Sequence, residues 1–190
     1  MNYPSWLWML INKWPDLVVT FLGISLGGLF AFVIAKWGIN KQTKNDIEKG
    51  KYLLGTKLDR VKIEIRDNRN RVQQLISALD NSQASRADLL AWATAIVNSF
   101  STSDYDRLMS TGLQKNSLPW GVEQEIYGAY DDLAGLSHMV EQACATQNIH
   151  LVGKLQFQNV KTYSNTILTG LNKAVNVIYE YVKTLTGDKE

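Results

Sequence analysis

The sequence predicts an all-α protein with a single N-terminal transmembrane helix followed by a cytosolic helical bundle of about four helices. Three observations lead there: an uncharged apolar run near the N-terminus, apolar residues at helical spacing through the rest of the chain, and no alternating strand pattern longer than a few residues. The expected parts are an external segment over residues 1–16, a span over 17–37, a basic connector over 38–53 and a helical domain over 54–190.

The N-terminal apolar run holds nineteen residues without a charge, 17–35, and reads LVVTFLGISLGGLFAFVIA. A hydrocarbon core about 30 Å thick is crossed by roughly 20 helical residues, so the run is long enough to span a bilayer. Tryptophans flank it, as is usual at the lipid–water interface, at Trp6, Trp8, Trp14 and Trp37. A cleaved signal peptide fits less well because the run is too long and starts late. A buried core helix would need a larger domain around it.

Basic residues predict the orientation of the span. The first sixteen residues carry one Lys and one Asp, whereas the stretch after the span carries Lys36, Lys41, Lys44, Lys49 and Lys51. Cytoplasmic flanks hold the excess of Lys and Arg, so we expect a cytosolic C-terminal domain, an external N-terminus and location in the inner (cytoplasmic) membrane. The single cysteine, Cys144, fits a reducing compartment because it excludes an internal disulfide.

Small residues recur every four positions within the span, at Gly23, Gly27, Ala31 and Ala35. Such a stripe lets two helix backbones approach closely, which predicts a face for self-association and hence a homo-oligomer. The alternative is that glycine is simply common in membrane helices.

A long helix is predicted to lead out of the membrane to about residue 80. Its apolar positions alternate steps of four and three, with one polar residue among them: Leu54, Leu58, Val61, Ile65, Asn68, Val72, Leu75 and Leu79. This stripe suits either a coiled coil between chains or an amphipathic helix in a bundle. Ile63 and Ile76 lie off the stripe and favour the bundle. Gly50 and Gly55 are the expected weak points of the helix.

The remaining helices have readable ends. Ser85-x-x-Asp88 resembles a capping box and precedes a helix with almost no polar face, which we expect to be central in the core. Another helix should begin near Pro119, since proline is tolerated in a first turn. Its apolar residues at helical spacing are Val122, Ile126, Tyr130, Leu133, Leu136, Val140 and Ala143. Residues 146–153 are predicted to form a turn, and Gly187 should end the last helix.

Positive charge concentrates after the span. Residues 36–71 hold eleven Lys or Arg against five acids, whereas residues 72–190 hold eight against twelve. Anionic lipids account for the lysines nearest the membrane. They do not account for Arg60, Arg66, Arg69 and Arg71, which a straight helix would place roughly 35–50 Å away, beyond the Debye length of about 8 Å.

Two interpretations of this arginine cluster remain. In the commoner situation, acids of the same helix pair with the arginines, namely Asp59, Glu64 and Asp67. In the other, copies of the helix meet in an oligomer and direct their arginines at a polyanion, because the planar guanidinium binds two phosphate oxygens at once. The candidate ligand-binding residues are then Arg66, Asn68, Arg69 and Arg71, with Asn148 and His150 of the predicted turn and the nearby Lys154.

Signatures of enzymes are absent from the sequence. There is no P-loop, no G-x-G-x-x-G and no H-E-x-x-H motif. His138 and His150 have no partner at metal-ligand spacing, and Cys144 has no adjacent basic residue to activate it. We therefore expect no catalytic residues, no metal site and no cofactor.

This layout, a span before a cytosolic helical domain, resembles that of membrane-anchored effectors of bacterial antiviral systems. It is similar in size and arrangement to the small membrane effectors of type III CRISPR systems. The resemblance implies a tetrameric cytosolic domain that binds a cyclic oligoadenylate. It covers layout and size without an aligned motif, so it assigns no binding residue.

Two hypotheses of different class follow. In one, the chain is a ligand-operated membrane effector whose helical domain binds an anionic signal and whose span perturbs the membrane or opens a pore. In the other, it is a membrane-anchored adaptor that recruits a protein partner. A structural or phage-derived membrane protein is a third possibility. The expected partners are membrane lipid, further copies of the chain and a cyclic oligonucleotide, with no duplex nucleic acid.

Overall fold

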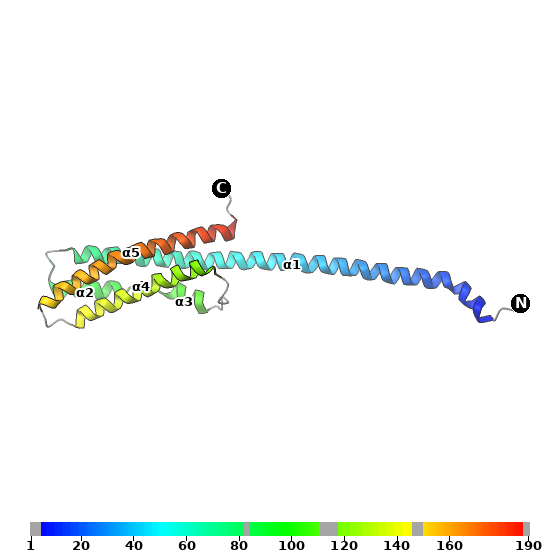
Figure 1. The fold of residues 1–190 in the computed structure, drawn as a ribbon, viewed down its shortest axis with the longest axis horizontal. Helices are drawn as coiled ribbons and strands as arrows, with labels where there is room; N and C mark the ends of the chain where they lie inside the picture. Colours follow the sequence, from blue (N-terminus) through cyan, green and yellow to red (C-terminus); the bar gives the residue numbers. More distant parts are fainter. Residues whose placement is uncertain (1–4, 82–83, 111–117, 146–149, 188–190) are drawn as a thin grey trace. The chain divides into compact units, whose positions relative to one another are not determined.

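The computed structural model describes the chain apart from residues 1–4, 82–83, 111–117, 146–149 and 188–190, and apart from the side chains of residues 5–12, 15–17 and 150–155. Within these described ranges the chain is helical and contains no strand, which confirms the predicted all-α class. The helices are α1 (Ser5–Leu79), α2 (Arg86–Val97), α3 (Ser103–Ser110), α4 (Trp120–Ala145) and α5 (His150–Thr186) (Figure 1).

The chain divides into two compact units, Met1–Gly50 and Lys51–Glu190, and α1 contributes residues to both. The second unit is called the helical domain below. The expected boundaries at residues 38 and 54 both fall inside α1, so no helix break marks them. The expected weak points, Gly50 and Gly55, are helical as well.

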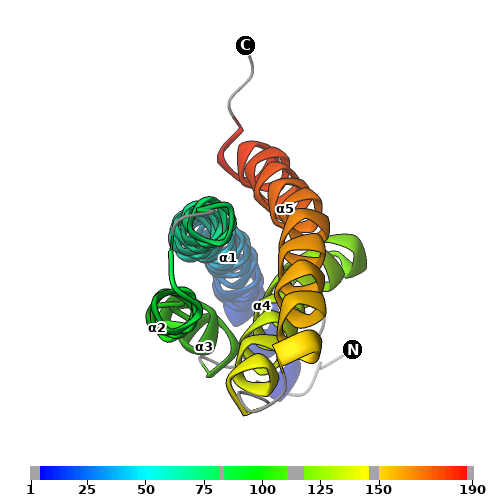
Figure 2. The same cartoon turned by 90° about the vertical axis from the view of Figure 1, so that its left-hand side faces the viewer.

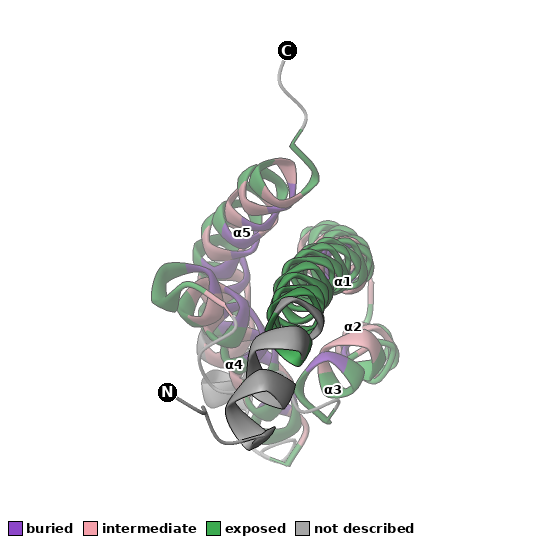
Figure 3. Cartoon of the chain, turned by 90° about the vertical axis from the view of Figure 1, so that its right-hand side faces the viewer, coloured by how far each residue is buried: buried purple, intermediate pink, exposed green. Residues whose placement is uncertain are grey.

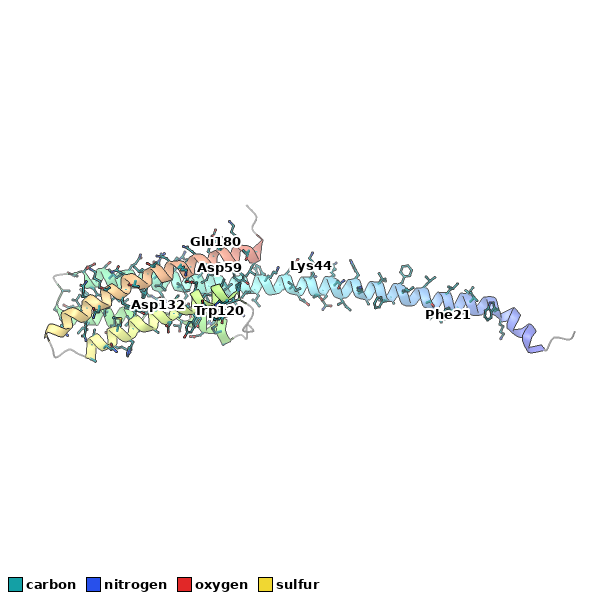
Figure 4. The ribbon with its side chains drawn as sticks, viewed as in Figure 1. Phe21, Lys44, Asp59, Trp120, Asp132 and Glu180 are labelled. Carbon is teal, nitrogen blue, oxygen red and sulfur yellow. The ribbon has the colours of Figure 1, made fainter. Side chains whose placement is uncertain are left out.

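The first unit consists of α1 without a core of its own. Each of its described side chains is exposed, and the ribbon of this part is coloured accordingly in Figure 3. Phe21, labelled in Figure 4, is 72% exposed. In the described part of the chain, α1 is the one helix whose length and composition would allow it to cross a membrane.

The apolar stripe predicted for α1 is the side that faces the core of the helical domain. Its six central positions have no exposed surface: Leu58, Val61, Ile65, Asn68, Val72 and Leu75. The five apolar residues among them belong to one cluster with residues from α2, α3, α4 and α5 of the same chain. The stripe is thus covered intramolecularly, which decides against its use as a coiled-coil seam between copies.

Helices α4 and α5 form the most extensive pairing in the helical domain and lie side by side (Figures 1 and 2). Helix α4 starts directly after Pro119, as predicted. All seven apolar positions predicted for α4 are buried: Val122, Ile126, Tyr130, Leu133, Leu136, Val140 and Ala143. Fully burying a large apolar side chain contributes about 1.5–3 kcal/mol, so this face supplies much of the stability of the domain.

Two glycines allow α4 and α5 to approach closely. A Cβ atom added to Gly135 of α4 would lie 2.7 Å from the hydroxyl oxygen of Tyr163, and one added to Gly170 of α5 would lie 3.1 Å from Asp132 Oδ2. Tyr163 and Asp132 hydrogen-bond to each other across the two helices. A side chain at Gly135 would displace the tyrosine that makes this bond.

Of the other predicted helix ends, the start of α2 and the end of α5 are confirmed, and the start of α5 is wrong. Ser85 and Asp88 form the capping box of α2, with Asp88 N–H donating to Ser85 Oγ over 3.2 Å and Ser85 N–H donating to Asp88 Oδ2 over 3.3 Å. Gly187 follows α5 with φ of +71°, a conformation that glycine adopts without strain. The turn expected over 146–153 is too long, because α5 already begins at His150.

The prediction that α2 is central in the core is wrong. Only one side of this helix is buried, through Leu90, Ala93 and Val97. The opposite side is exposed over Ala87, Ala91, Trp92 and Ala95. A helix that is apolar all round carries no sequence signal for which side faces the core, and α2 packs mainly against α4.

Two isoleucines of α1 test this arrangement. Ile65 is fully buried, whereas Ile63 is 45% exposed. Ile65→Ala should lower the free energy of unfolding by about 2–5 kcal/mol because it leaves a cavity, and Ile63→Ala should cost roughly 1 kcal/mol or less. Urea denaturation followed by circular dichroism measures both. Equal losses would contradict the assignment of the core face.

Candidate functional site

Polar residues of α1 lie on two different sides of the helix in the helical domain. Residues three or four apart share a side. One side faces α5 and carries Lys62, Arg66 and Arg69. The other faces the segment between α2 and α3 and carries Glu64, Asn68 and Arg71.

A groove runs between α1 and α5. A hollow of about 370 Å³ is lined by Lys62, Ile63, Arg66, Val175, Asn176 and Tyr179. An adjoining hollow of about 280 Å³ shares Lys62 and Tyr179 and extends past Asp59, Val182, Lys183 and Thr186. The two hollows together are called the α1–α5 groove. Asp59 is labelled beside this region in Figure 4.

The basic side chains at the α1–α5 groove differ in how they are held. Lys62 Nζ lies 2.6 Å from Asp59 Oδ1 and 5.5 Å from the centre of the Tyr179 ring. Arg69 donates from Nη1 to Asn172 Oδ1 over 3.0 Å, while its buried Nε has no hydrogen-bond partner. Arg66 is exposed and takes part in no ion pair within the described ranges. The groove therefore presents the N–H donors of Arg66 without an ion-pair partner among the described residues, and Arg69 lies on the same side of α1.

The expected pairing of the three acids with arginines along α1 is not found among the described residues. Asp59 pairs with Lys62, and Glu64 is buried among hydroxyl and backbone N–H donors. Among the described residues, no ion pair includes Arg60, Arg66, Arg69 or Arg71. Local ion pairs are therefore not the reason for the basic excess.

Glu64 is the centre of a buried polar cluster. Glu64 is only 6% exposed. Its carboxylate accepts hydrogen bonds from five donors, namely Ser101 Oγ at 2.8 Å, Ser103 Oγ at 3.2 Å, Asp104 N at 2.9 Å, Tyr105 N at 3.3 Å and Tyr130 Oη at 2.5 Å. Two of these donors are backbone N–H groups in the first turn of α3, which have no partner within their own helix. A carboxylate of α1 thus caps α3.

The cluster stabilises the ionised form of Glu64. Burial by itself raises the pKa of this carboxyl, but hydrogen bonds from the Asp104 N–H, the Tyr130 and Ser101 hydroxyls and the Tyr105 N–H outweigh it, so the net pKa lies below its ordinary value of 4.5. The pKa of Tyr130 is raised, first by burial and then by its bond to Glu64. The proton consequently stays on Tyr130, and the charge stays on Glu64.

Asn68 holds the same segment one turn further along α1. Its Nδ2 donates to the Ser101 carbonyl over 2.7 Å, and its Oδ1 accepts from Ser101 N–H and from Arg71 Nη1, each over 3.0 Å. Asn68 is fully buried. The structure therefore separates the predicted ligand residues: Arg66 and Arg69 face α5, whereas Asn68 and Arg71 hold the segment before α3.

The other predicted site residues are placed less fully. Asn148 lies outside the described residues, and His150 and Lys154 belong to α5 although their side chains lie outside the description. The small residues of the predicted association face, Gly23, Gly27, Ala31 and Ala35, are all exposed.

Sequence reasoning missed Glu64, Tyr130 and the α5 side of the groove. Glu64 precedes Asn68 by four residues, so its position beside the buried stripe was a signal that it faces inward. Tyr130 was recognised as a core position, but its hydroxyl needs a partner when buried. Asn176 and Tyr179 could be assigned to a groove only once α5 was known to lie against α1.

No group of three or more metal-ligating side chains occurs in the part of the chain that the structure describes. Comparisons with protein-family models, with curated proteins and with solved structures find no match to this chain.

Replacing the buried carboxylate tests its role. Glu64→Gln should lower the free energy of unfolding at pH 7 by about 2 kcal/mol or more, because hydrogen bonds to a charged group are the stronger ones. The pKa of Glu64 is lowered by folding, so its contribution is present above pH 4.5 and lost as the pH falls through the lower folded value. The difference between the two proteins should therefore shrink on acidification.

Denaturation at pH 7 and below pH 4 measures this difference. Asp67→Asn, at an exposed acid of the same helix, is the matched control and should change stability by less than about 0.5 kcal/mol. A pH-independent difference between wild type and Glu64→Gln would contradict the assignment of charge to Glu64.

Proposed function

We propose that the protein is an oligomeric, single-pass effector of the inner membrane. The apolar run of α1 crosses the bilayer, and the cytosolic helical domain binds a phosphate-bearing ligand of the cyclic oligonucleotide class in the α1–α5 groove. Binding changes how the spans pack, which perturbs the membrane or opens a pore. The resemblance in layout to antiviral effectors favours a role in defence.

The exposed apolar surface of α1 supports the membrane part of this proposal. Contiguous apolar surface left in water costs about 25 cal/mol per Å², and a soluble monomer rarely leaves so long a patch uncovered. Phe21, Phe30 and Phe32 are each at least 66% exposed. In a bilayer, lipid chains cover the apolar surface of such a helix, so no partner protein is needed to shield it from water. The lysines that follow the run then set the domain on the cytosolic side.

One observation carries the proposal: the groove and the apolar run belong to the same helix. Lys62, Arg66 and Arg69 lie on α1, which also contains the predicted span. A ligand that bridges α1 and α5 acts directly on the helix that enters the membrane. It can change the packing of that helix only if it binds one arrangement more tightly than another.

The lining of the groove suits one nucleotide unit. Arginine binds phosphate oxygens in pairs, the Asn176 amide offers hydrogen bonds to a base edge, and the Tyr179 ring offers a face for stacking. The hollow between these residues measures about 370 Å³, near the lower end for small-molecule sites. A ligand of several nucleotides would therefore need the grooves of several copies, in agreement with the predicted homo-oligomer.

The span offers a face for that oligomer. A Cβ atom added to Gly23 or Gly27 would meet nothing within 4 Å in the same chain, so this side of the helix is open to another helix. Ala31 and Ala35 continue the side at the same spacing.

A second candidate function, a membrane-anchored adaptor, has its own supporting observation. Large exposed side chains gather where α3 ends and α4 begins, and Met109, Trp120 and Tyr127 line a hollow of about 520 Å³ there. Trp120 is 71% exposed and is labelled in Figure 4. Such aromatic surface is typical of sites where proteins dock.

A thermal-shift screen of the full chain in lipid nanodiscs tests the effector proposal. Cyclic di-, tri-, tetra- and hexanucleotides are added, and a ligand at a hundred times its dissociation constant should stabilise the fold by about 2.7 kcal/mol. Arg66→Glu should remove the shift without changing the melting temperature of the unliganded protein. Arg60→Glu, at an exposed arginine of the same helix, should keep it. No shift with any nucleotide would favour the adaptor.

The role of the span is tested by enlarging its small residues. Gly23→Leu with Gly27→Leu should prevent close helix approach, so the oligomer should dissociate and ligand-induced dye leakage from liposomes should be lost. Ser25→Leu enlarges a small residue on another side of the helix and should have a smaller effect. The thermal stability of the helical domain should stay the same in all variants. An unchanged oligomer and unchanged leakage would reject this face.

A further inference from the structure

A further hollow, called the α2 hollow below, runs along the exposed side of α2 and shares no lining residue with the α1–α5 groove. It measures about 780 Å³ and is lined by α2 together with Cys144 of α4. Its floor is made by small side chains one turn apart, Ala87, Ala91 and Ala95, with Leu90 beside them. The volume lies in the range of small-molecule sites, about 300–1,000 Å³.

The hollow is long, apolar and charged at one end. It extends from Arg86 to Asn98, which is about 18 Å along a helix at 1.5 Å per residue. Among the described residues that line it, Arg86 is the charged one. Thr94 and Cys144 hydrogen-bond to each other over 3.4 Å, so these polar atoms of the wall already have a partner. A ligand for this surface needs an apolar body and one anionic end.

Arg86 forms no ion pair with an acidic side chain in the described part of the chain. Its Nε and Nη2 atoms are buried and have no hydrogen-bond partner in the described part of the chain. The acids closest to it in the sequence are engaged elsewhere, since Asp88 caps α2 through Ser85 and Asp80 pairs with Lys161. Leaving charged donors buried and unpaired is unfavourable, so the Arg86 side chain gains hydrogen bonds if it turns these donors toward an anion in the hollow.

The two unpaired atoms of Arg86 define the kind of anion. Nε and Nη2 carry parallel N–H groups along one edge of the planar guanidinium, and this edge matches the two oxygens of a carboxylate. We propose that the α2 hollow binds an amphiphilic carboxylate, with its apolar chain along Ala87, Ala91 and Ala95 and its carboxylate on the Arg86 guanidinium, which turns its Nε–Nη2 edge into the hollow when the ligand binds. This proposal does not depend on the function proposed for the α1–α5 groove.

Two sources supply this chemistry. One is a small carboxylic acid in solution, and the other is a free fatty acid that leaves a bilayer. Both present the same head group and the same flexible apolar chain, and they differ in whether the ligand arrives from water or from lipid. The experiment below separates them.

Cys144 gives a direct readout because it lines the hollow and is the single cysteine of the chain. The full chain in nanodiscs is alkylated with iodoacetamide, and the rate is followed with increasing octanoate. We expect octanoate to slow the reaction at least fivefold at saturation, whereas octanamide, its uncharged analogue, should have little effect. Nanodiscs doped with oleate test the lipid source in the same assay.

Variants locate the bound carboxylate. Arg86→Gln should raise the half-protecting octanoate concentration at least tenfold, and Arg86→Lys should raise it less because a point charge remains without the fork. Ala91→Leu should abolish protection by filling the hollow. The matched controls are Arg60→Gln and Ala134→Leu, exposed positions outside the hollow. Melting temperatures show that each variant is folded. If Arg86→Gln does not fold, Ala91→Leu still tests whether the ligand occupies the hollow.

Each result of the alkylation experiment either supports or overturns one part of the proposal. Protection by octanoate in plain nanodiscs supports a soluble ligand, and protection that appears only with oleate supports a ligand from the membrane. Equal protection by octanamide would overturn recognition of the carboxylate. Protection that survives both Arg86→Gln and Ala91→Leu would overturn the site, and so would the absence of protection by either acid.

Discussion

The buried carboxylate of Glu64 joins three helices of the domain, and the positions of the other elements depend on it. A carboxylate out of water is unfavourable unless several donors surround it, and here five donors do so from the segment before α3, from α3 itself and from α4. Removing the carboxylate would leave the first N–H groups of α3 and the Tyr130 hydroxyl without partners in the core. The cluster therefore sets where α3 and its preceding segment lie against α1.

This constraint divides α1 into a fixed side and an adjustable side. Glu64 and Asn68 hold the segment around Ser101 through hydrogen bonds to its backbone and its hydroxyl group. On the opposite side, the contact with α5 includes Lys62, Arg66 and Arg69, long side chains that reach neighbours near the surface. In the proposed function, a ligand acts on the adjustable side, and the fixed side makes α1 respond together with α3 and α4.

Much of the fold could be predicted because helical periodicity records which side of a helix is buried. The stripe from Leu58 to Leu75 and the inner side of α4 were predicted residue by residue, since polar and apolar residues alternate clearly there. The burial pattern of α2 could not be predicted because the exposed Ala87, Ala91 and Ala95 are of the same residue type as the buried Ala93. The site was predicted only in part. Arg66 and Arg69 share a side, but Asn172, which accepts a hydrogen bond from Arg69, and Asn176, which lines the groove with Arg66, come from a helix more than a hundred residues away.

The fixed side of α1 also bears on whether the two proposed sites influence each other. The α2 hollow ends at Asn98, and the segment that follows Asn98 is the one held by Glu64 and Asn68. A ligand that only fills the hollow leaves these bonds unchanged and has no effect on the α1–α5 groove. A ligand that moves α2 must strain the bonds to Ser101, and α1 then shares the displacement. Because such coupling is reciprocal, an anion in the groove would change the affinity of the hollow by the same factor. The hydrogen bonds between Asn68 and Ser101 are therefore the element through which the two sites would communicate.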